Sequence, residues 1–158
     1  MDKRTTIHLP AERHRQLREI AARRGFAKIT DFLDDVIARE AATLGIASGL
    51  IAVALAEGGN LVLSVDGLPD IALTRTQASE LAGDVAATVA GDREGAGWGW
   101  DATPGIEFRR QGRGFSLAVT LRVAKNNRAG WGYDHHRRGL TEGLARELAS
   151  ALRAAADS

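Results

Sequence analysis

The sequence contains no cysteine among its 158 residues. Disulfide bonds and thiolate metal sites are therefore excluded, and nothing in the composition points to an oxidising compartment. Long apolar runs are also missing: the longest weakly polar stretch, residues 44–55, has 12 residues and is interrupted by glycines, too short to span a bilayer. The first residues lead into alternating sequence without the apolar stretch of a signal peptide. We therefore expect a soluble cytoplasmic protein with no membrane association.

Recognisable catalytic motifs are lacking as well. There is no phosphate-binding glycine loop, no nucleophile elbow and no histidine–carboxylate motif with mechanistic spacing. The adjacent His135 and His136 would point in different directions on one element, so we expect no metal site there. The sequence therefore predicts a protein that is not an enzyme and carries no cofactor.

What the chain does contain is a globular composition, 44% hydrophobic and 26% charged, with an uneven charge distribution. The overall charge is +1, but residues 1–28 hold eight Lys and Arg against three Asp and Glu, a net +5, which leaves −4 for the rest. A basic segment before a mildly acidic body suits a phosphate-binding module joined to a domain of another kind. A solvated basic helix face would give the same charge.

The first 45 residues have the pattern of one strand and two helices. Residues 4–10 alternate with period two and end at Pro10, which suits the first turn of a helix. Helical spacing follows over 11–24, and Gly25 suits a left-handed cap. A second amphipathic helix is predicted from the three-and-four spacing of Ile29, Phe32, Leu33, Val36, Ile37, Ala41 and Leu44, and we expect it to end at Gly45.

So short a unit cannot bury a core alone, and a lone strand leaves both of its edges unpaired. Two copies could pair their strands antiparallel and interlock their helices. This segment resembles the ribbon-helix-helix family, the MetJ/Arc/CopG class of DNA-binding proteins. The features that match are, in order, the strand, Pro10, Leu17-x-x-Ile20-Ala21, Gly25, Phe32-Leu33 and Val36-Ile37. The resemblance covers residues 1–45 only. It implies an intertwined homodimer that binds double-stranded DNA, with higher oligomers on longer sites.

The resemblance also implies roles for particular residues. Side chains on the outward face of the ribbon would read bases in the major groove, and backbone N–H groups that open the second helix would hold a phosphate. Two departures from the family are Arg13-His14, where an apolar residue is usual, and Ala27, where a small hydroxyl residue is common. Alternatively, the outward residues are only the solvated face of a strand. The expected base readers are Arg4, Thr6 and His8, and the expected phosphate-binding residues are Lys3, Ala27, Lys28, Ile29 and Thr30.

Beyond the module we expect a helical extension or linker over 46–60 and an α+β domain over 61–158. Within that domain the pattern predicts the order β-β-α-β-β-α. The helices resemble each other at an offset of 67 residues, so a duplicated unit with both helices on one face of a four-stranded sheet is one interpretation, and shared helix propensity is the other. The predicted strands are 61–65, 70–73, 105–110 and 115–123, and the predicted helices are 74–90 and 141–155.

Two glycine-flanked aromatic segments echo each other within this domain. Ala96-Gly97-Trp98-Gly99-Trp100-Asp101 returns as Ala129-Gly130-Trp131-Gly132-Tyr133-Asp134. Rings in this setting could hold a flat ligand, stack on bases or anchor a protein, and the alternative is that they pack a sheet face or a dimer interface. The candidate residues for a small-molecule effector or protein partner are Trp98, Trp100, Trp131 and Tyr133.

A set of arginines offers a second phosphate contact, with a solvated basic turn as the alternative: Arg109, Arg110, Arg113, Arg137 and Arg138. Taken together, the sequence favours a sequence-specific DNA-binding transcriptional regulator, a bacterial repressor. A plasmid accessory protein acting in a relaxosome or in partition, and an antitoxin-like autoregulator, are the alternatives.

Overall fold

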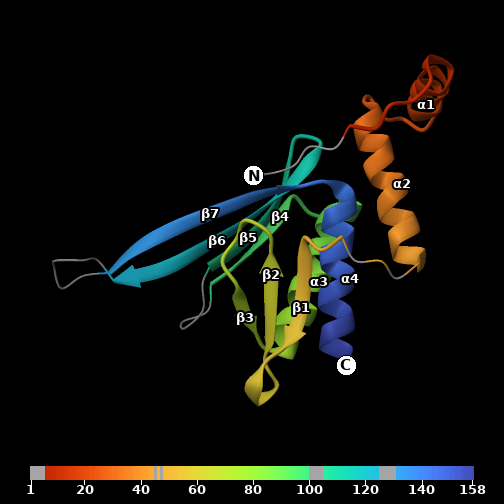
Figure 1. Cartoon of the computed structure of the whole chain (residues 1–158). Coiled ribbons are helices and arrows are strands. Elements are labelled where there is room, and N and C mark those ends of the chain that lie inside the picture. The colour runs from red at the N-terminus through yellow and green to blue at the C-terminus, as the bar shows by residue number, and fades with distance from the viewer. Residues whose placement is uncertain (1–5, 45, 47, 100–104, 125–130) are drawn as a thin grey trace.

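The computed structural model describes residues 6–44, 46, 48–99, 105–124 and 131–158. Within these ranges the chain is α+β, with four α-helices and two antiparallel sheets, so the predicted class is confirmed. The two N-terminal helices stand at one end of the molecule, and the remaining elements form a single body (Figure 1). We call residues 6–44 the N-terminal module and residues 48–158 the body.

Both helices of the N-terminal module form where the pattern predicts them. Helix α1 spans Ala11–Arg23 and α2 spans Ile29–Leu44. Gly25 has a φ of 84°, and the N–H of Phe26 reaches back to the carbonyl of Ala21 at 2.9 Å, which closes the helix end. The predicted strand is different: residues 6–10 form no strand in the single chain, so the described order here is helix then helix.

The first sheet contains a strand that the sequence did not predict. Strand β1 (Ile51–Leu55) pairs antiparallel with β2 (Leu61–Val65), which pairs with β3 (Ile71–Leu73). The expectation of a helical extension or linker over 46–60 is therefore wrong. The alanine-rich stretch favours a helix locally, but hydrogen bonding to β2 and burial of Ile51 make it a strand. The predicted β2–β3 hairpin is confirmed.

Helix α3 (Arg75–Ala90) begins at the predicted capping box. The Thr74 hydroxyl accepts from the N–H of Gln77 at 3.1 Å, and the Gln77 side chain accepts from the N–H of Thr74 at 2.8 Å. Helix α4 (Glu142–Asp157) begins after Thr141, whose hydroxyl accepts from the N–H of Leu144. Both helices are confirmed to within two residues of the predicted ends.

The second sheet has four strands in the order β4-β5-β6-β7, all antiparallel. The predicted hairpin corresponds to β5 (Gly105–Gln111) and β6 (Gly114–Ala124), but β4 (Gly95–Trp98) and β7 (Trp131–Leu140) were not predicted as strands. The body therefore reads β-β-β-α-β-β-β-β-α, and the predicted order β-β-α-β-β-α lacks three strands. The glycines of β4 and the charged residues of β7 have low strand propensity, so the sequence pattern did not predict these strands. They form because β4 pairs with β5 and β7 pairs with β6.

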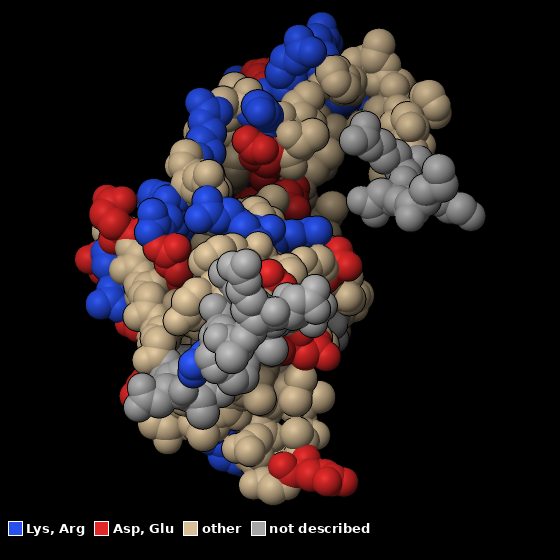
Figure 2. Space-filling view, turned by 90° about the vertical axis from the view of Figure 1, so that its left-hand side faces the viewer, with Lys and Arg blue, Asp and Glu red and all other residues tan. Residues whose placement is uncertain are grey.

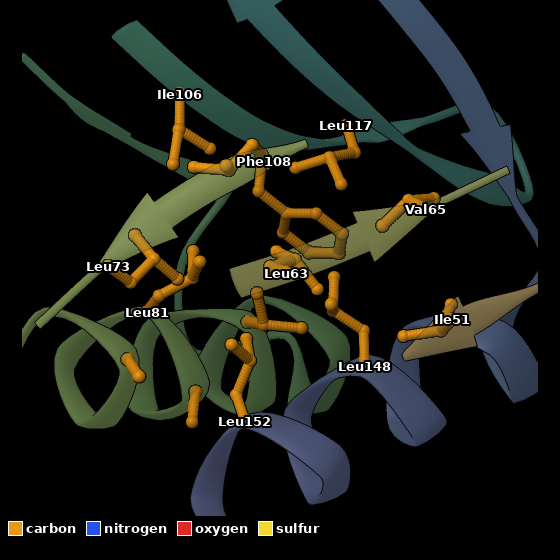
Figure 3. Close-up of a cluster of buried hydrophobic side chains, with 14 of the residues drawn as sticks. Ile51, Leu63, Val65, Leu73, Leu81, Ile106, Phe108, Leu117, Leu148 and Leu152 are labelled. Atoms are coloured by element: carbon orange, nitrogen blue, oxygen red, sulfur yellow. The ribbon is translucent and has the colours of Figure 1, made fainter. Parts of the chain in front are cut away.

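A single hydrophobic core joins both sheets and both helices of the body. Phe108 and Leu117 approach it from the second sheet, Leu63 from the first, and Leu148 and Leu152 from α4 (Figure 3). Helices α3 and α4 pack against each other. The predicted arrangement of two helices on one face of a single four-stranded sheet is thus replaced by a core shared by two sheets.

The β6–β7 hairpin extends past the rest of the second sheet (Figure 1). Strand β5 begins at Gly105, opposite Thr120, whereas β6 continues to pair with β7 as far as Ala124 opposite Trp131. The end of this hairpin is therefore a two-stranded arm.

Candidate nucleic-acid interface

The predicted base-reading segment lies fully exposed in front of α1. Thr6 and His8 are exposed, while Lys3 and Arg4 lie outside the described residues. The alternate, apolar residues are exposed too: Ile7 keeps 80% of its surface and Leu9 keeps 45%. Alternation of apolar and polar residues is typical of a strand with one buried face. In the single chain both faces of this segment are exposed, so nothing covers its apolar side.

The turn between α1 and α2 carries the predicted phosphate-binding residues. Ala27, Lys28 and Thr30 are exposed and Ile29 is half-buried. The carbonyl of Lys28 accepts the N–H of Phe32 at 3.3 Å, so Lys28 lies at the N-terminal boundary of α2. The first N–H groups of the helix have no acceptor within it, as at any helix start. The turn thus presents backbone donors beside a lysine.

Packing within the module buries few of its apolar side chains. Ala21 and Phe32 are buried, and the Phe26 ring meets the Phe32 ring edge-on at 5.6 Å between centroids. By contrast, Ile20, Ile37 and Leu44 remain 46%, 65% and 68% exposed. The module therefore has an uncovered apolar surface, formed by exposed aliphatic side chains on both helices.

The basic part of the module is α1 with the turn after it: residues 11–28 hold six Lys and Arg against two Glu, whereas α2 holds one Arg against four Asp and Glu. Figure 2 shows Lys and Arg side chains gathered at the upper end, at the height of α1 in Figure 1. In the described part of the chain, Arg23 pairs with Glu19 and Arg39 with Asp35. The remaining cations, which form no ion pair among the described residues, are Arg13, Arg15, Arg18, Arg24 and Lys28. These charges are available to an anionic partner.

The two aromatic segments do not come together. Trp98 ends β4, half-buried against the core, and Tyr133 lies on β7 with 66% of its surface exposed. Strands β4 and β7 are the opposite edges of the second sheet, separated by β5 and β6. Trp100 lies outside the described residues, as does the side chain of Trp131. Trp98 and Tyr133 therefore cannot hold one flat ligand between them.

The arginines predicted as a second phosphate contact divide between two faces of the sheet. Arg110 donates to the carbonyls of Thr88 and Val89 at the end of α3 and lies over the Phe115 ring at 5.1 Å. Arg138 pairs with Asp66 at 3.3 Å. Arg109 and Arg137 point to the other face, where Arg109 pairs with Glu107. A single five-arginine cluster is therefore not formed, because adjacent strand residues face opposite ways.

A groove where the module meets the body was not predicted. It has a volume of about 960 Å³ and lies between α2, β1 and α4. Gly143 approaches Ala38 closely, and Glu147 accepts from the N–H and hydroxyl of Ser48 at 3.0 and 2.8 Å. The sequence did not predict this groove because residues 51–55 have the composition of a helix, so no strand was expected beside α2.

Two other kinds of site are absent from the described ranges. No group of three or more potential metal-binding side chains occurs there, and no helix there has the length and apolar character needed to cross a membrane. Comparison of the chain with protein-family models, curated proteins and solved structures found no match.

Proposed function

We propose that this protein is a homodimeric, sequence-specific DNA-binding regulator, a bacterial repressor acting in the cytoplasm. Two copies pair their residues 5–9 as an antiparallel ribbon, which enters the major groove of duplex DNA. Arg4, Thr6 and His8 read base edges, and the turn at 27–30 holds a phosphate on each side.

The observation that carries the proposal is the uncovered apolar surface of the module. Ile7 and Leu9 precede α1, and Ile20 and Ile37 lie on the helices, all exposed in the single chain. A second copy would cover them and would supply the missing strand for residues 5–9. An apolar patch of this kind beside the basic helix α1 supports dimerisation combined with polyanion binding.

The alternation of the segment supports the choice of reading residues. Pairing through the ribbon would place Ile7 and Leu9 toward the helices, which leaves Thr6 and His8, with Arg4, on the opposite face. Their chemistry suits base edges: a guanidinium can bind guanine O6 and N7, a threonine offers a hydroxyl and a methyl group, and an imidazole donates or accepts.

The body would serve oligomerisation or response to an effector. Its contact with α2 supports this role, because the groove beside α2 is the place where a bound molecule would alter how the module is held. The extensive core of the body favours a regulator over an antitoxin, whose C-terminal tail is commonly disordered until bound.

The test is Arg4→Ala in the full chain. Genome-wide mapping of bound sites first supplies the operator and shows whether it lies at promoters, as for a repressor, or at a plasmid transfer or partition locus. We expect Arg4→Ala to bind that operator about tenfold or more weakly while remaining folded and dimeric, because a bidentate guanine contact contributes about 1–3 kcal/mol. The control is Arg153→Ala, an exposed arginine on α4 far from the module in sequence.

Wild-type operator affinity for Arg4→Ala at moderate salt would remove Arg4 from the reading face. Equal losses in both variants would indicate a general charge effect instead of base recognition.

A further inference from the structure

The second sheet has an outer face that no other described element covers. The inward face carries Ile106, Phe108, Leu117 and Val119, all buried in the core. Residues that alternate with these point outward, and the pairing register aligns them in rows across the strands. The outward residues of β5, β6 and β7 are Gly105, Glu107, Arg109, Gln111, Ser116, Ala118, Thr120, Arg122, Tyr133, His135, Arg137 and Gly139.

This outer face is flat because its centre is made of small side chains. Ser116 and Ala118 lie in the middle strand, and Gly139 lies beside Ser116 on β7. A Cβ built on Gly139 would meet nothing within 4 Å, so packing within the chain does not require glycine there. Ser116 is buried and Ala118 is half-buried, whereas Gly139 is exposed, so the open part of this face lies along β7.

Cations and an aromatic ring border this flat centre. Tyr133 is 66% exposed and lies directly opposite Arg122 on the neighbouring strand. His135 and Arg137 follow on the same face of β7, both exposed, and His135 Nδ1 shares a hydrogen bond of 3.0 Å with the Thr120 hydroxyl. Arg137 makes no hydrogen bond or ion pair with any described residue.

The exposed part of this face carries an unpaired cation on a body whose charges nearly balance. Among the described outward residues of β5, β6 and β7, Arg137 forms no ion pair and follows the exposed His135 on β7, whereas Arg109 is bound to Glu107. The body, residues 48–158, holds 12 Lys and Arg against 13 Asp and Glu, a net −1. An exposed aromatic ring and an exposed arginine in one row of a strand suit single-stranded nucleic acid, because cations contact its backbone and rings stack on its bases.

We infer that the outer face of β5, β6 and β7 binds single-stranded nucleic acid without strong sequence preference. Tyr133 stacks on a base, Arg137 contacts a phosphate, and the exposed Gly139 lets the strand lie close to β7. Duplex DNA fits less well, because its bases are stacked inside and Tyr133 would gain no partner. The inference is independent of the N-terminal module.

The experiment uses the full chain and a fluorescein-labelled oligothymidylate of about 20 nucleotides, longer than the ~4–16 nucleotides that one single-strand-binding fold covers. Fluorescence anisotropy gives its Kd, and an unrelated duplex of equal length is measured beside it. We expect tighter binding of the single strand than of the duplex, weakening as salt rises.

Four variants locate the site. Tyr133→Ala is expected to weaken binding about tenfold while Tyr133→Phe retains it, because stacking needs the ring and not the hydroxyl. Arg137→Ala is expected to weaken binding and to reduce the slope of log K against log salt by ~0.7. Arg153→Ala, on α4, is expected to bind as the wild type, and thermal melts establish that all variants are folded.

Two results would overturn the inference. The first is binding of the single strand no tighter than the duplex. The second is wild-type affinity in both Tyr133→Ala and Arg137→Ala, which together with a loss in Arg4→Ala would assign the strand to the N-terminal module. Binding of the duplex operator is tested separately with Arg4→Ala, and its result does not depend on Tyr133.

Discussion

Arg109 and Arg110 are neighbours in β5, yet their surroundings differ because one points outward and the other inward. Arg109 is more than half exposed and pairs with Glu107 on the surface. Arg110 reaches the negative end of α3, where it donates to the carbonyls of Thr88 and Val89, and its guanidinium covers the Phe115 ring. The two residues therefore contribute to stability to different extents.

We predict that Arg110→Met lowers the free energy of unfolding by about 1–2 kcal/mol, since it removes charged hydrogen bonds to two carbonyls and a cation–π contact. Arg109→Met is the control and is expected to change it by less than about 0.5 kcal/mol, as for an exposed ion pair. Urea unfolding of the full chain measures both. Equal effects of the two substitutions would contradict the role of Arg110 at the end of α3.

At the scale of elements, the contact between α2 and α4 joins the module to the body. Gly143, near the start of α4, allows the approach: a Cβ there would lie 2.7 Å from the Cβ of Ala38 and 3.1 Å from Oδ2 of Asp34. Real Cβ atoms do not approach so closely, and neither neighbour is the far end of a long flexible chain. A larger residue at 143 must therefore move α2 away from α4.

We predict that Gly143→Val loosens α2 without unfolding the body. Overpacking of this kind costs about 1–3 kcal/mol, so amide hydrogen exchange in α2 should accelerate by roughly five- to hundredfold. The matched control is Gly83→Ala in α3, where a Cβ meets nothing within 4 Å and where helix propensity favours Ala by up to about 1 kcal/mol. Unchanged exchange in α2 of Gly143→Val would show that the contact does not hold the module.

At the scale of the whole molecule, the proposed dimer is the main expectation. The body has a core of its own, whereas the module leaves Ile37 and Leu44 largely exposed. Covering them in a symmetric dimer would also bring two basic ends and two ribbons together, as a twofold DNA site requires.

We predict that Ile37→Glu dissociates the dimer, raising its dissociation constant about a hundredfold or more, because the interface would have to bury an unpaired charge. Analytical ultracentrifugation measures this, with Leu55→Glu as the control. Leu55 lies on β1 outside the module and has the same 65% exposure as Ile37, so a general effect of adding charge would appear in both variants. A monomeric wild type, or a dimeric Ile37→Glu, would contradict the proposed assembly.

Local patterns were sufficient wherever an element carries its own signals. The capping box at Thr74, the Gly25 cap and the apolar stretches of β2 and β6 each act over a few residues, and the four α-helices of the described residues were predicted from local signals. For the candidate site, the sequence likewise indicated the basic module and the exposed turn at 27–30. It could not separate Arg109 from Arg110 by role, since that depends on the face that each residue takes in a sheet.

Sequence by itself determined the helices, two hairpins and the basic N-terminal module, because propensity, capping and periodicity are properties of neighbouring residues. Tertiary structure alone decided that residues 51–55, 95–98 and 131–140 are strands, since each is stabilised by a neighbouring strand and not by its own composition. It also decided that Trp98 and Tyr133 lie on opposite edges of the second sheet, and that the arginines divide between its two faces. Strand pairing joins residues distant in sequence, and the alternation of faces turns one-residue differences in register into different surroundings.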